Sequence, residues 1–350
     1  MKIYIHAGIE KTGSSHLQSL CAINRESLLE QGIWFPAAAK NDVELTKGEI
    51  SAGNAQSLTD YLNSFDFENT KLFMKNHLEE AVKRKCQKLL LSNELLLIAL
   101  SEEKKLREFD LIIKDLNVVE VSLLVVLRDP LDQALSLYKH RAKSGRALEI
   151  EEWPKKNYVY GNKIKLFFNN LEKYNYNLSV RKFLKKNMWL EKIFFSDWLK
   201  LEIELTQPPK VVNPSLSLSE LLLIKKIRKY QPKLVSKIYN RFIKLNKREK
   251  AEDSTIEKYH NQILYDYLIK YCKTWDLCNT FLYEEEALVF ENPNFENKFT
   301  QKKVTSFSDT QLDVLASIVS ESFDPFFWFK FQNTKLKLLL SKVLYRLKLK

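Results

Sequence analysis

The positions of apolar residues divide the first 200 residues of the chain into short continuous apolar runs and longer amphipathic stretches. Short runs rich in leucine, isoleucine and valine, bounded by polar turns, are typical of parallel strands that are buried on both faces. The runs that predict strands or short extended pieces are residues 2–7, 33–35, 88–92 and 118–127. A further strand is predicted at 177–183, where Leu178, Val180 and Phe183 interrupt polar residues.

Stretches with the apolar spacing of a helix separate these runs. The predicted helices cover residues 14–31, 55–65, 68–85, 102–114 and 132–144, and a polar loop is expected at 40–53. Strands that alternate with helices predict a doubly wound parallel sheet. We therefore expect an α/β fold of three layers, in which helices flank a central parallel sheet.

The second half of the chain has a different pattern. Residues 221–250 and 254–275 show helical periodicity, and residues 290–306 have the composition of a loop. Residues 221–250 contain eleven lysines or arginines and a single acid, Glu249. We expect residues 1–200 to form the α/β core and residues 201–350 to form a mainly helical, basic extension, with one continuous domain as the alternative.

Charge and cysteine content narrow the class of protein. The 350 residues carry a net charge of +12, which favours an anionic partner such as a nucleotide, an acidic glycan, nucleic acid or a membrane surface. The four cysteines and five histidines show no metal-ligand spacing, so we expect free thiols and no required metal. The start MKIYIHAG lacks signal-peptide architecture, and no apolar stretch has the length of a membrane span. A cytoplasmic protein is the expectation.

The turn after the first predicted strand has the residues of an anion-binding cradle. The segment IHAGIEKTGSSHLQ contains Lys11-Thr12-Gly13-Ser14-Ser15. Glycines let the backbone approach a ligand, a helix N-terminus presents free N–H groups, and lysine and serine add further donors to a phosphate or sulfate. A serine-capped helix with a solvated lysine is the alternative. The lysine precedes the glycine, unlike in GxxxxGK[ST], which weakens an ATPase or kinase interpretation.

A second candidate anion site follows the strand at 118–127. In LLVVLRDPLDQALSLYKHRAKSG, Arg128 stands at the carboxyl end of the strand, where open α/β sheets bind ligands. Pro130 suits the first turn of a helix, and Ser136 lies about two helical turns further on. Arginine recognises anions through two parallel hydrogen bonds. The alternative is an Asp-Pro helix start whose Arg128 pairs with a nearby carboxylate.

Together the two motifs resemble the sulfotransferases that use 3′-phosphoadenosine 5′-phosphosulfate (PAPS). The resemblance covers residues 1 to about 145 and is closest to bacterial members that sulfate carbohydrates. It implies a P-loop-NTPase-like fold, binding of the 5′-phosphosulfate by residues 11–15, and binding of the 3′-phosphate by Arg128 and Ser136. The implied acceptor is a hydroxyl of a capsular polysaccharide, a lipopolysaccharide or another glycan.

Sulfuryl transfer to a hydroxyl needs stabilisation of the leaving group and a base for the acceptor proton. Lys11 is the expected stabiliser. Glu94 directly follows the strand at 88–92, and because members of the family use Glu or His as the base, the resemblance favours Glu94. His6, at the end of the first strand, is the second candidate, with a packed or loop-orienting histidine as its alternative. Glu10 and His16 are expected to be solvated or supporting groups.

The sequence contains fewer indications of the residues that bind the acceptor or cover the nucleotide. Asn54, in Gly53-Asn54-Ala55-Gln56, is a candidate sugar ligand, with a helix cap as the alternative. Lys302 and Lys303 are weak candidates for a loop that covers the nucleotide. The basic, amphipathic segment KLKLLLSKVLYRLKLK at the C-terminus predicts peripheral contact with the inner face of a membrane and a lipid-linked acceptor, or else a helix docked on the core.

Two other function classes stay open on the sequence. One is a kinase with a variant phosphate loop, which needs Mg²⁺ and a carboxylate ligand after a second strand. The other is a non-catalytic binder of an anionic glycan, favoured by the net charge. The basic segments lack the aromatic interleaving of a nucleic-acid module, so nucleic acid is not an expected partner.

Overall fold

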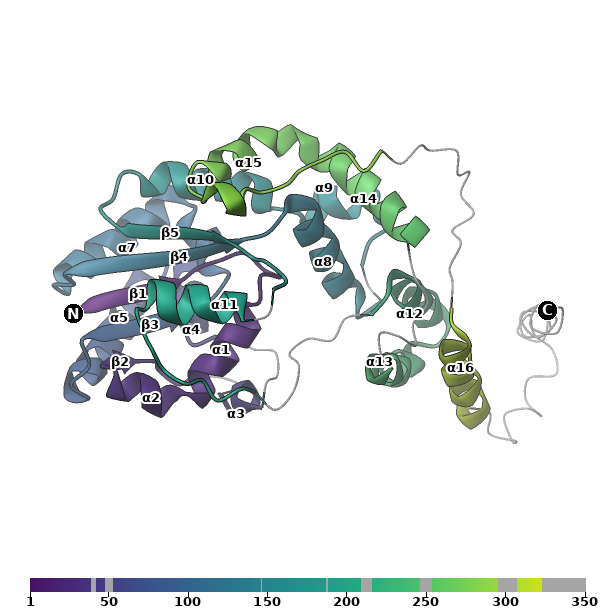
Figure 1. Ribbon diagram of the computed structural model, residues 1–350, viewed down its shortest axis with the longest axis horizontal. Coiled ribbons are helices and arrows are strands. Elements are labelled where there is room, and N and C mark those ends of the chain that lie inside the picture. Colours follow the sequence, from purple (N-terminus) through teal and green to yellow (C-terminus); the bar gives the residue numbers. More distant parts are fainter. Residues whose placement is uncertain are drawn as a thin grey trace. The chain divides into compact units, whose positions relative to one another are not determined.

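A five-stranded, entirely parallel sheet forms the centre of the α/β part of the chain (Figure 1). The computed structural model describes residues 1–38, 42–47, 53–145, 147–186, 188–208, 216–245, 254–294 and 307–322. The strands are β1 (Lys2–His6), β2 (Ile33–Trp34), β3 (Lys88–Ser92), β4 (Glu120–Leu127) and β5 (Asn177–Lys182). Every predicted strand is confirmed. The C-terminal basic segment, Lys302 and Lys303 lie outside the described residues.

The strand order β2-β3-β1-β4-β5 places β1 between β3 and β4. The chain runs from β1 to β3 on one side of β1 and then crosses to β4 on the other side, so the order reverses at the β1–β4 pair. In open α/β sheets, ligands bind outside the carboxyl ends of the strands at such a reversal. The turns that follow β1, β3 and β4 therefore meet at the edge of the sheet where a ligand is expected.

Helices cover both faces of the sheet (Figure 1). The helices before β4 are α1 (Ser14–Ile23), α2 (Arg25–Glu30), α3 (Asp42–Thr46), α4 (Gln56–Asn63), α5 (Phe67–Lys83), α6 (Leu96–Leu100) and α7 (Glu103–Asp115). Those after β4 are α8 (Pro130–Ala142), α9 (Trp153–Asn157), α10 (Tyr160–Leu171), α11 (Trp189–Glu191) and the π-helix η1 (Lys192–Trp198). The three-layer architecture expected from the sequence is confirmed.

Alternate residues of each strand face opposite layers. Tyr4, Leu90 and Leu124 join a buried apolar cluster with residues of α1, α2, α11 and η1. Ile3, Ile5, Leu89 and Leu91 have the opposite parity and are 0% exposed, on the side where α5 and α7 lie (Figure 1). Burial of both faces explains why these strands read as continuous apolar runs.

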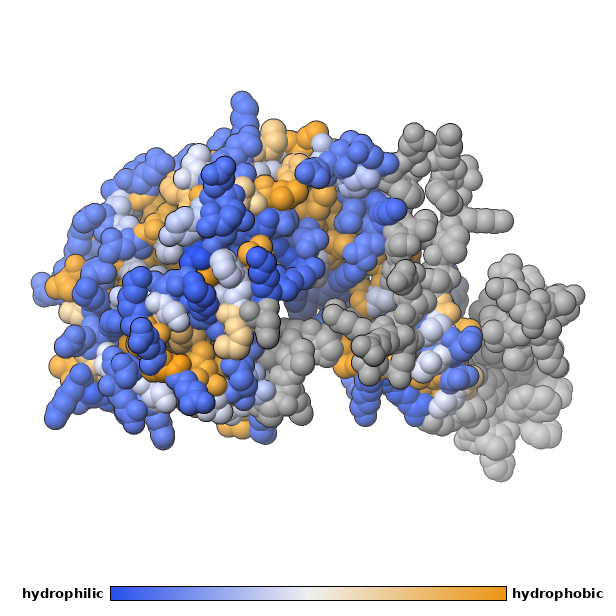
Figure 2. All heavy atoms as spheres, in the orientation of Figure 1, coloured by the Kyte–Doolittle hydropathy of each residue, from blue (hydrophilic) through white to orange (hydrophobic). Residues whose placement is uncertain are grey.

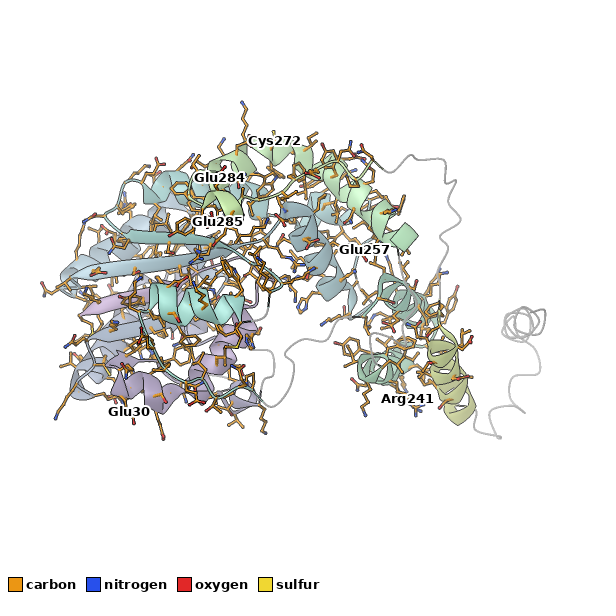
Figure 3. All side chains as sticks on the ribbon, viewed as in Figure 1. Glu30, Arg241, Glu257, Cys272, Glu284 and Glu285 are labelled. Carbon is orange, nitrogen blue, oxygen red and sulfur yellow. The ribbon has the colours of Figure 1, made fainter. Side chains whose placement is uncertain are left out.

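Two compact units are assembled from interleaved segments of the chain. The first combines residues 1–142, 146–215 and 254–303, and the second combines residues 143–145, 216–253 and 304–350. The expected division at residue 200 does not coincide with these units. Helix α14 (Ser254–Leu268) packs on α8, where Lys139 pairs with Glu257 at 3.3 Å (Glu257 is labelled in Figure 3). The short helix η4 (Ile269–Tyr271), α15 (Cys272–Asn279) and η5 (Glu284–Glu286) follow in the same unit.

The second unit is a small helical assembly. Its described elements are α12 (Leu218–Tyr230), η2 (Pro232–Leu234), α13 (Val235–Lys244) and α16 (Asp309–Ser322). A capping box starts α12, because Ser217 accepts from the Glu220 N–H and the Glu220 carboxylate accepts from the Ser217 N–H. Gln311 of α16 donates to the same carboxylate at 2.7 Å, and Arg241 (labelled in Figure 3) donates to Ser317 at 2.6 Å. These contacts join α12, α13 and α16.

Candidate functional site

The turn after β1 folds back on itself before α1 begins. The N–H groups of Ala7 and Ile9 donate to carbonyls of β4, so the chain follows β4 beyond the end of β1. The buried Thr12 hydroxyl closes the loop by donating to the Ile9 carbonyl at 2.7 Å. Lys11 and Gly13 have φ values of 72° and 88°, the left-handed conformation that reverses the chain. The predicted cradle is therefore a built loop rather than an extended linker.

Helix α1 begins with unused hydrogen-bonding capacity. The first N–H groups of a helix have no intrahelical acceptor, and no side chain caps the start of α1. The hydroxyl oxygen of Ser14 is buried and has no hydrogen-bond partner, while Ser15 beside it is half-buried. A buried hydroxyl without a partner is costly unless a ligand completes its bonding. This end of α1 has the donors that an oxyanion requires.

The side chains packed against residue 13 leave room only for glycine. A Cβ on Gly13 would lie 2.5 Å from a methyl carbon of Leu190 in α11 and 3.3 Å from the ring of Phe183. The Phe183 ring also lies under the Arg128 guanidinium, with 5.5 Å between the guanidinium carbon and the ring centroid. The segment after β5 therefore packs against both anion motifs. Sequence reasoning missed this segment, because its aromatic and basic residues match no short motif.

The two anion motifs are in direct contact. Because β1 pairs with β4, the turns that follow them are neighbours, and Arg128 donates to the Lys11 carbonyl at 3.1 Å. A second guanidinium nitrogen forms an ion pair with Asp132 at 3.1 Å, while the buried Nε of Arg128 has no partner. Lys185, from the segment after β5, lies 3.4 Å from the same Asp132 carboxylate. Arg128 and Lys185 thus share one carboxylate beside the loop that carries Lys11.

One face of α8 lines the cradle. Gln133 donates to the Glu10 carbonyl at 3.2 Å, and His140 Nδ1 lies 3.5 Å from the Lys11 ammonium. Ser136 is half-buried and lies between Gln133 and His140 along the helix, at the spacing that brings side chains to one face. Ser136 therefore lies on the face of α8 that carries Gln133 and His140, and its role in anion binding stays a prediction.

Lys11 lies in a partly desolvated, mixed electrostatic environment. Burial lowers the pKa of its ammonium, the carboxylates of Glu10 and Glu94 raise it, and Arg128 and Arg141 lower it further. Glu10 is held by Arg141, which lies 2.8 and 2.9 Å from its two oxygens, and by the Tyr160 hydroxyl at 2.8 Å. Glu10 is thus a fixed group behind the loop and not a solvated one.

Glu94 follows β3 at the same edge of the sheet. Its pKa is raised to about 7, mainly by burial and also by the charge of Glu10, while a backbone hydrogen bond, the hydrogen bond from Gln18 and the charge of Lys11 act in the opposite direction. A carboxylate that is about half ionised near neutral pH is suited to accept a proton. Glu94 and Lys11 follow the neighbouring strands β3 and β1, and the charge of each affects the pKa of the other.

His6 and His16 have structural partners. His6 is 1% exposed, its Nδ1 lies 2.9 Å from the Ser92 hydroxyl, and its ring packs edge-on against Phe194. Burial lowers the pKa of His6 to about 4, so the ring is neutral at pH 7 and binds a proton weakly. This favours the orienting role over that of the base. His16 pairs with Glu191 of α11 at 2.8 Å and so connects α1 to α11.

The predicted sugar ligand Asn54 has a different environment. It is 4% exposed, donates to the Leu90 carbonyl at 2.9 Å and accepts from the Ser92 N–H at 2.7 Å. The Asn54 side chain therefore supplies the hydrogen-bond partners that a neighbouring strand would offer to the end of β3. Nothing in this geometry favours contact with an acceptor, and the predicted role of Asn54 stays a prediction without support.

An apolar cavity of about 400 Å³ lies beside η1. It is lined by Met188, Trp189, Glu191, Lys192, Phe195, Ser196, Leu201, Glu202, Ile203 and Leu205. Figure 2 shows apolar residues gathered below α11 on a face otherwise covered largely by polar side chains. None of the predicted site residues lines this cavity. Among the described residues there is no cluster of three or more potential metal ligands and no helix with the length and hydropathy of a membrane span.

Comparison of the chain with protein-family models, with curated proteins and with solved structures finds no match. The residues at the carboxyl edge of the sheet and their geometry are therefore what any functional assignment depends on.

Proposed function

We propose that the protein is a PAPS-dependent sulfotransferase with a nucleotide-binding fold of the P-loop-NTPase type. The observation that carries this proposal is the convergence of Lys11, Arg128 and Glu94, which follow the adjacent strands β1, β4 and β3. Two anion-binding groups beside one proton-accepting carboxylate suit a donor with two anionic ends and an acceptor with a hydroxyl.

The chain's unpaired donors fit a nucleotide with two anionic groups. The buried Ser14 hydroxyl and the N-terminus of α1 would hold the 5′-phosphosulfate, together with Lys11, Thr12, Gly13 and Ser15. The buried Nε of Arg128, which has no protein partner, and the half-buried Ser136 would hold the 3′-phosphate. When bound, PAPS supplies the sulfuryl group that the acceptor oxygen receives, with the 3′,5′-bisphosphate as the other product.

Each catalytic residue then has one task. Glu94 accepts the proton of the acceptor hydroxyl while the oxygen of that hydroxyl forms the new bond to sulfur. Lys11 stabilises the negative charge that develops on the departing phosphate oxygen. His6 orients Ser92 from inside the core and remains neutral. No step uses a metal ion.

The expected acceptor is a carbohydrate hydroxyl, on the resemblance of residues 1–145 to bacterial carbohydrate sulfotransferases. The basic helices α12 and α13 support an acidic glycan as one such acceptor, since residues 218–244 contain eight lysines or arginines and only one acid, the buried Glu220. Contact with a membrane surface and a lipid-linked acceptor rest on the C-terminal segment and stay predictions.

The direct test is transfer of sulfur-labelled sulfuryl groups from PAPS to a panel of neutral and acidic glycans. We expect the wild-type protein to label at least one glycan, and Glu94→Gln to lower the rate about 10²- to 10⁴-fold because the base is lost. Absence of transfer to every glycan, or equal rates for both proteins, would contradict the proposal.

A further inference from the structure

Gln18 is a fully buried glutamine of α1 that belongs to neither anion motif. Its exposed fraction is 0%. Its side-chain nitrogen lies 3.3 Å from the Ser92 hydroxyl and 3.4 Å from a carboxylate oxygen of Glu94. A single carboxamide thus connects the last residue of β3 to the carboxylate that follows it.

The contacts continue from Ser92 into the core. The Ser92 hydroxyl lies 2.9 Å from His6 Nδ1, and the two residues are register partners of β3 and β1. Both are 1% exposed. A chain of polar contacts therefore runs from Glu94 through Gln18 and Ser92 to His6. Buried networks of this kind hold their members in one arrangement when the hydrogen bonds are made.

The backbone beside Gln18 restricts the position of its amide. Gly53 has a φ of 80°, and a Cβ there would overlap the Ser92 carbonyl oxygen and lie 2.6 Å from the Gln18 side-chain nitrogen. Glycine lets the chain pass this close. The Gln18 amide is thereby enclosed between residue 53, Ser92 and Glu94.

We propose that Gln18 is a positioning residue that holds the Glu94 carboxylate in its proton-accepting orientation through a hydrogen bond, with Ser92 and His6 as its anchor. This inference rests on the proposed function, because it assigns Gln18 to the same reaction. In this proposal Gln18 acts through Glu94.

The hydrogen bond has a measurable electrostatic consequence. The titratable groups whose charges interact with Glu94 are Glu10 and Lys11 from the loop after β1 and Tyr160 from α10. Burial and Glu10 raise the pKa of Glu94, whereas Lys11 and the bond from Gln18 lower it. Loss of the Gln18 donor alone therefore raises the pKa of Glu94, since the ionised form loses a stabilising partner.

The test is a carbon-13 NMR titration of the Glu94 carboxyl group in the full chain without ligands. In Gln18→Met, which keeps the length of the side chain, we expect the Glu94 midpoint to rise by about half a unit. The matched control is Gln311→Met. Gln311 is also 0% exposed and donates to a carboxylate, but that carboxylate is Glu220 of the second unit, which is not among the groups that shift the pKa of Glu94, so we expect the wild-type midpoint.

Turnover provides a second readout. Because Gln18→Met loses the orientation of Glu94, we expect turnover below that of wild type at pH 9. At pH 6 we expect a further loss of about threefold, since less of Glu94 is ionised and only the ionised form accepts a proton. If Gln18→Met lowered turnover only by disturbing the structure, the factor would be the same at both pH values. That result would overturn the proposal.

An unchanged Glu94 midpoint in Gln18→Met would also overturn it. If this variant does not fold, Ser92→Ala provides the same test, because it removes the hydroxyl that anchors the amide. We expect a smaller rise of the midpoint in Ser92→Ala, and an unchanged midpoint there counts against the proposal. The titration is independent of sulfuryl transfer, so an inactive wild-type protein would contradict the proposed function and leave the role of Gln18 measurable.

Discussion

Lys11 and Arg128 are neighbouring cations with different surroundings. Lys11 extends from a left-handed turn, and its ammonium lies 3.5 Å from His140 Nδ1. Arg128 is fixed by the Lys11 carbonyl and Asp132 and keeps one buried N–H without a partner. A mobile ammonium suits charge that develops during a reaction, whereas a fixed guanidinium suits recognition of a permanent anion.

This difference predicts that alanine variants of the two residues fail in different ways. We expect Lys11→Ala to lower turnover about 10²- to 10³-fold with little change in affinity for the 3′,5′-bisphosphate. Arg128→Ala should lower that affinity about 10- to 100-fold through loss of charged hydrogen bonds. Steady-state kinetics and calorimetry measure the two effects. Arg107→Ala, at an exposed cation paired with Glu108, is the control, and unchanged binding and turnover in both site variants would refute the assignment.

Glu94 makes stability depend on pH in a defined direction. The pKa of Glu94 is raised from 4.5 to about 7. Between these pH values the folded protein therefore keeps a proton on Glu94 that the unfolded chain has already released. The free energy of unfolding therefore falls as pH rises from about 4.5 to about 7. Glu94→Gln removes this contribution. We therefore expect the thermal midpoint of Glu94→Gln, minus that of wild type, to increase as the pH rises over this range. A difference that stays constant with pH would contradict the raised pKa.

The elements show which structural features a sequence pattern can predict. Continuous apolar runs predicted β1, β3 and β4, because these strands are buried on both faces. The strand β5 was instead predicted from apolar residues that interrupt polar ones, and its first half is partly exposed. The single helix predicted at 14–31 is divided at Asn24, whose carboxamide bonds to the carbonyl of Leu20 and to both backbone groups of Thr206. That partner lies 182 residues away, so local periodicity does not indicate the break. The loop expected at 40–53 contains the short helix α3.

Asn54 illustrates the same limit within the predicted site. Its polar side chain in a Gly-Asn turn resembles a ligand for a sugar, but its partners are backbone groups of β3. We expect Asn54→Ala to lower the free energy of unfolding by about 1–3 kcal/mol, because the buried Ser92 N–H loses its acceptor. Chemical denaturation measures this loss. A stable Asn54→Ala protein with a raised KM for the glycan acceptor would instead restore the predicted role in substrate binding.

At the scale of the whole molecule, strand order decides which residues meet. Lys11, Arg128 and Glu94 are far apart in the chain, and the convergence of three strand ends brings them to one edge. Their positions at strand ends made this part of the site predictable. Gln18, His140, Phe183 and Lys185 were not predictable, because their relation to the site depends on how α1, α8 and the segment after β5 pack.

Calorimetric titration of the full chain with 3′-phosphoadenosine 5′-phosphate, and separately with ATP and Mg²⁺, tests the central claim most directly. The bisphosphate has both anionic ends for which the two motifs are suited, whereas ATP lacks the 3′-phosphate expected at Arg128. We predict micromolar or tighter binding of the bisphosphate and at least tenfold weaker binding of ATP with Mg²⁺. Preferential binding of ATP with Mg²⁺, or no binding of the bisphosphate, would contradict a PAPS-dependent sulfotransferase.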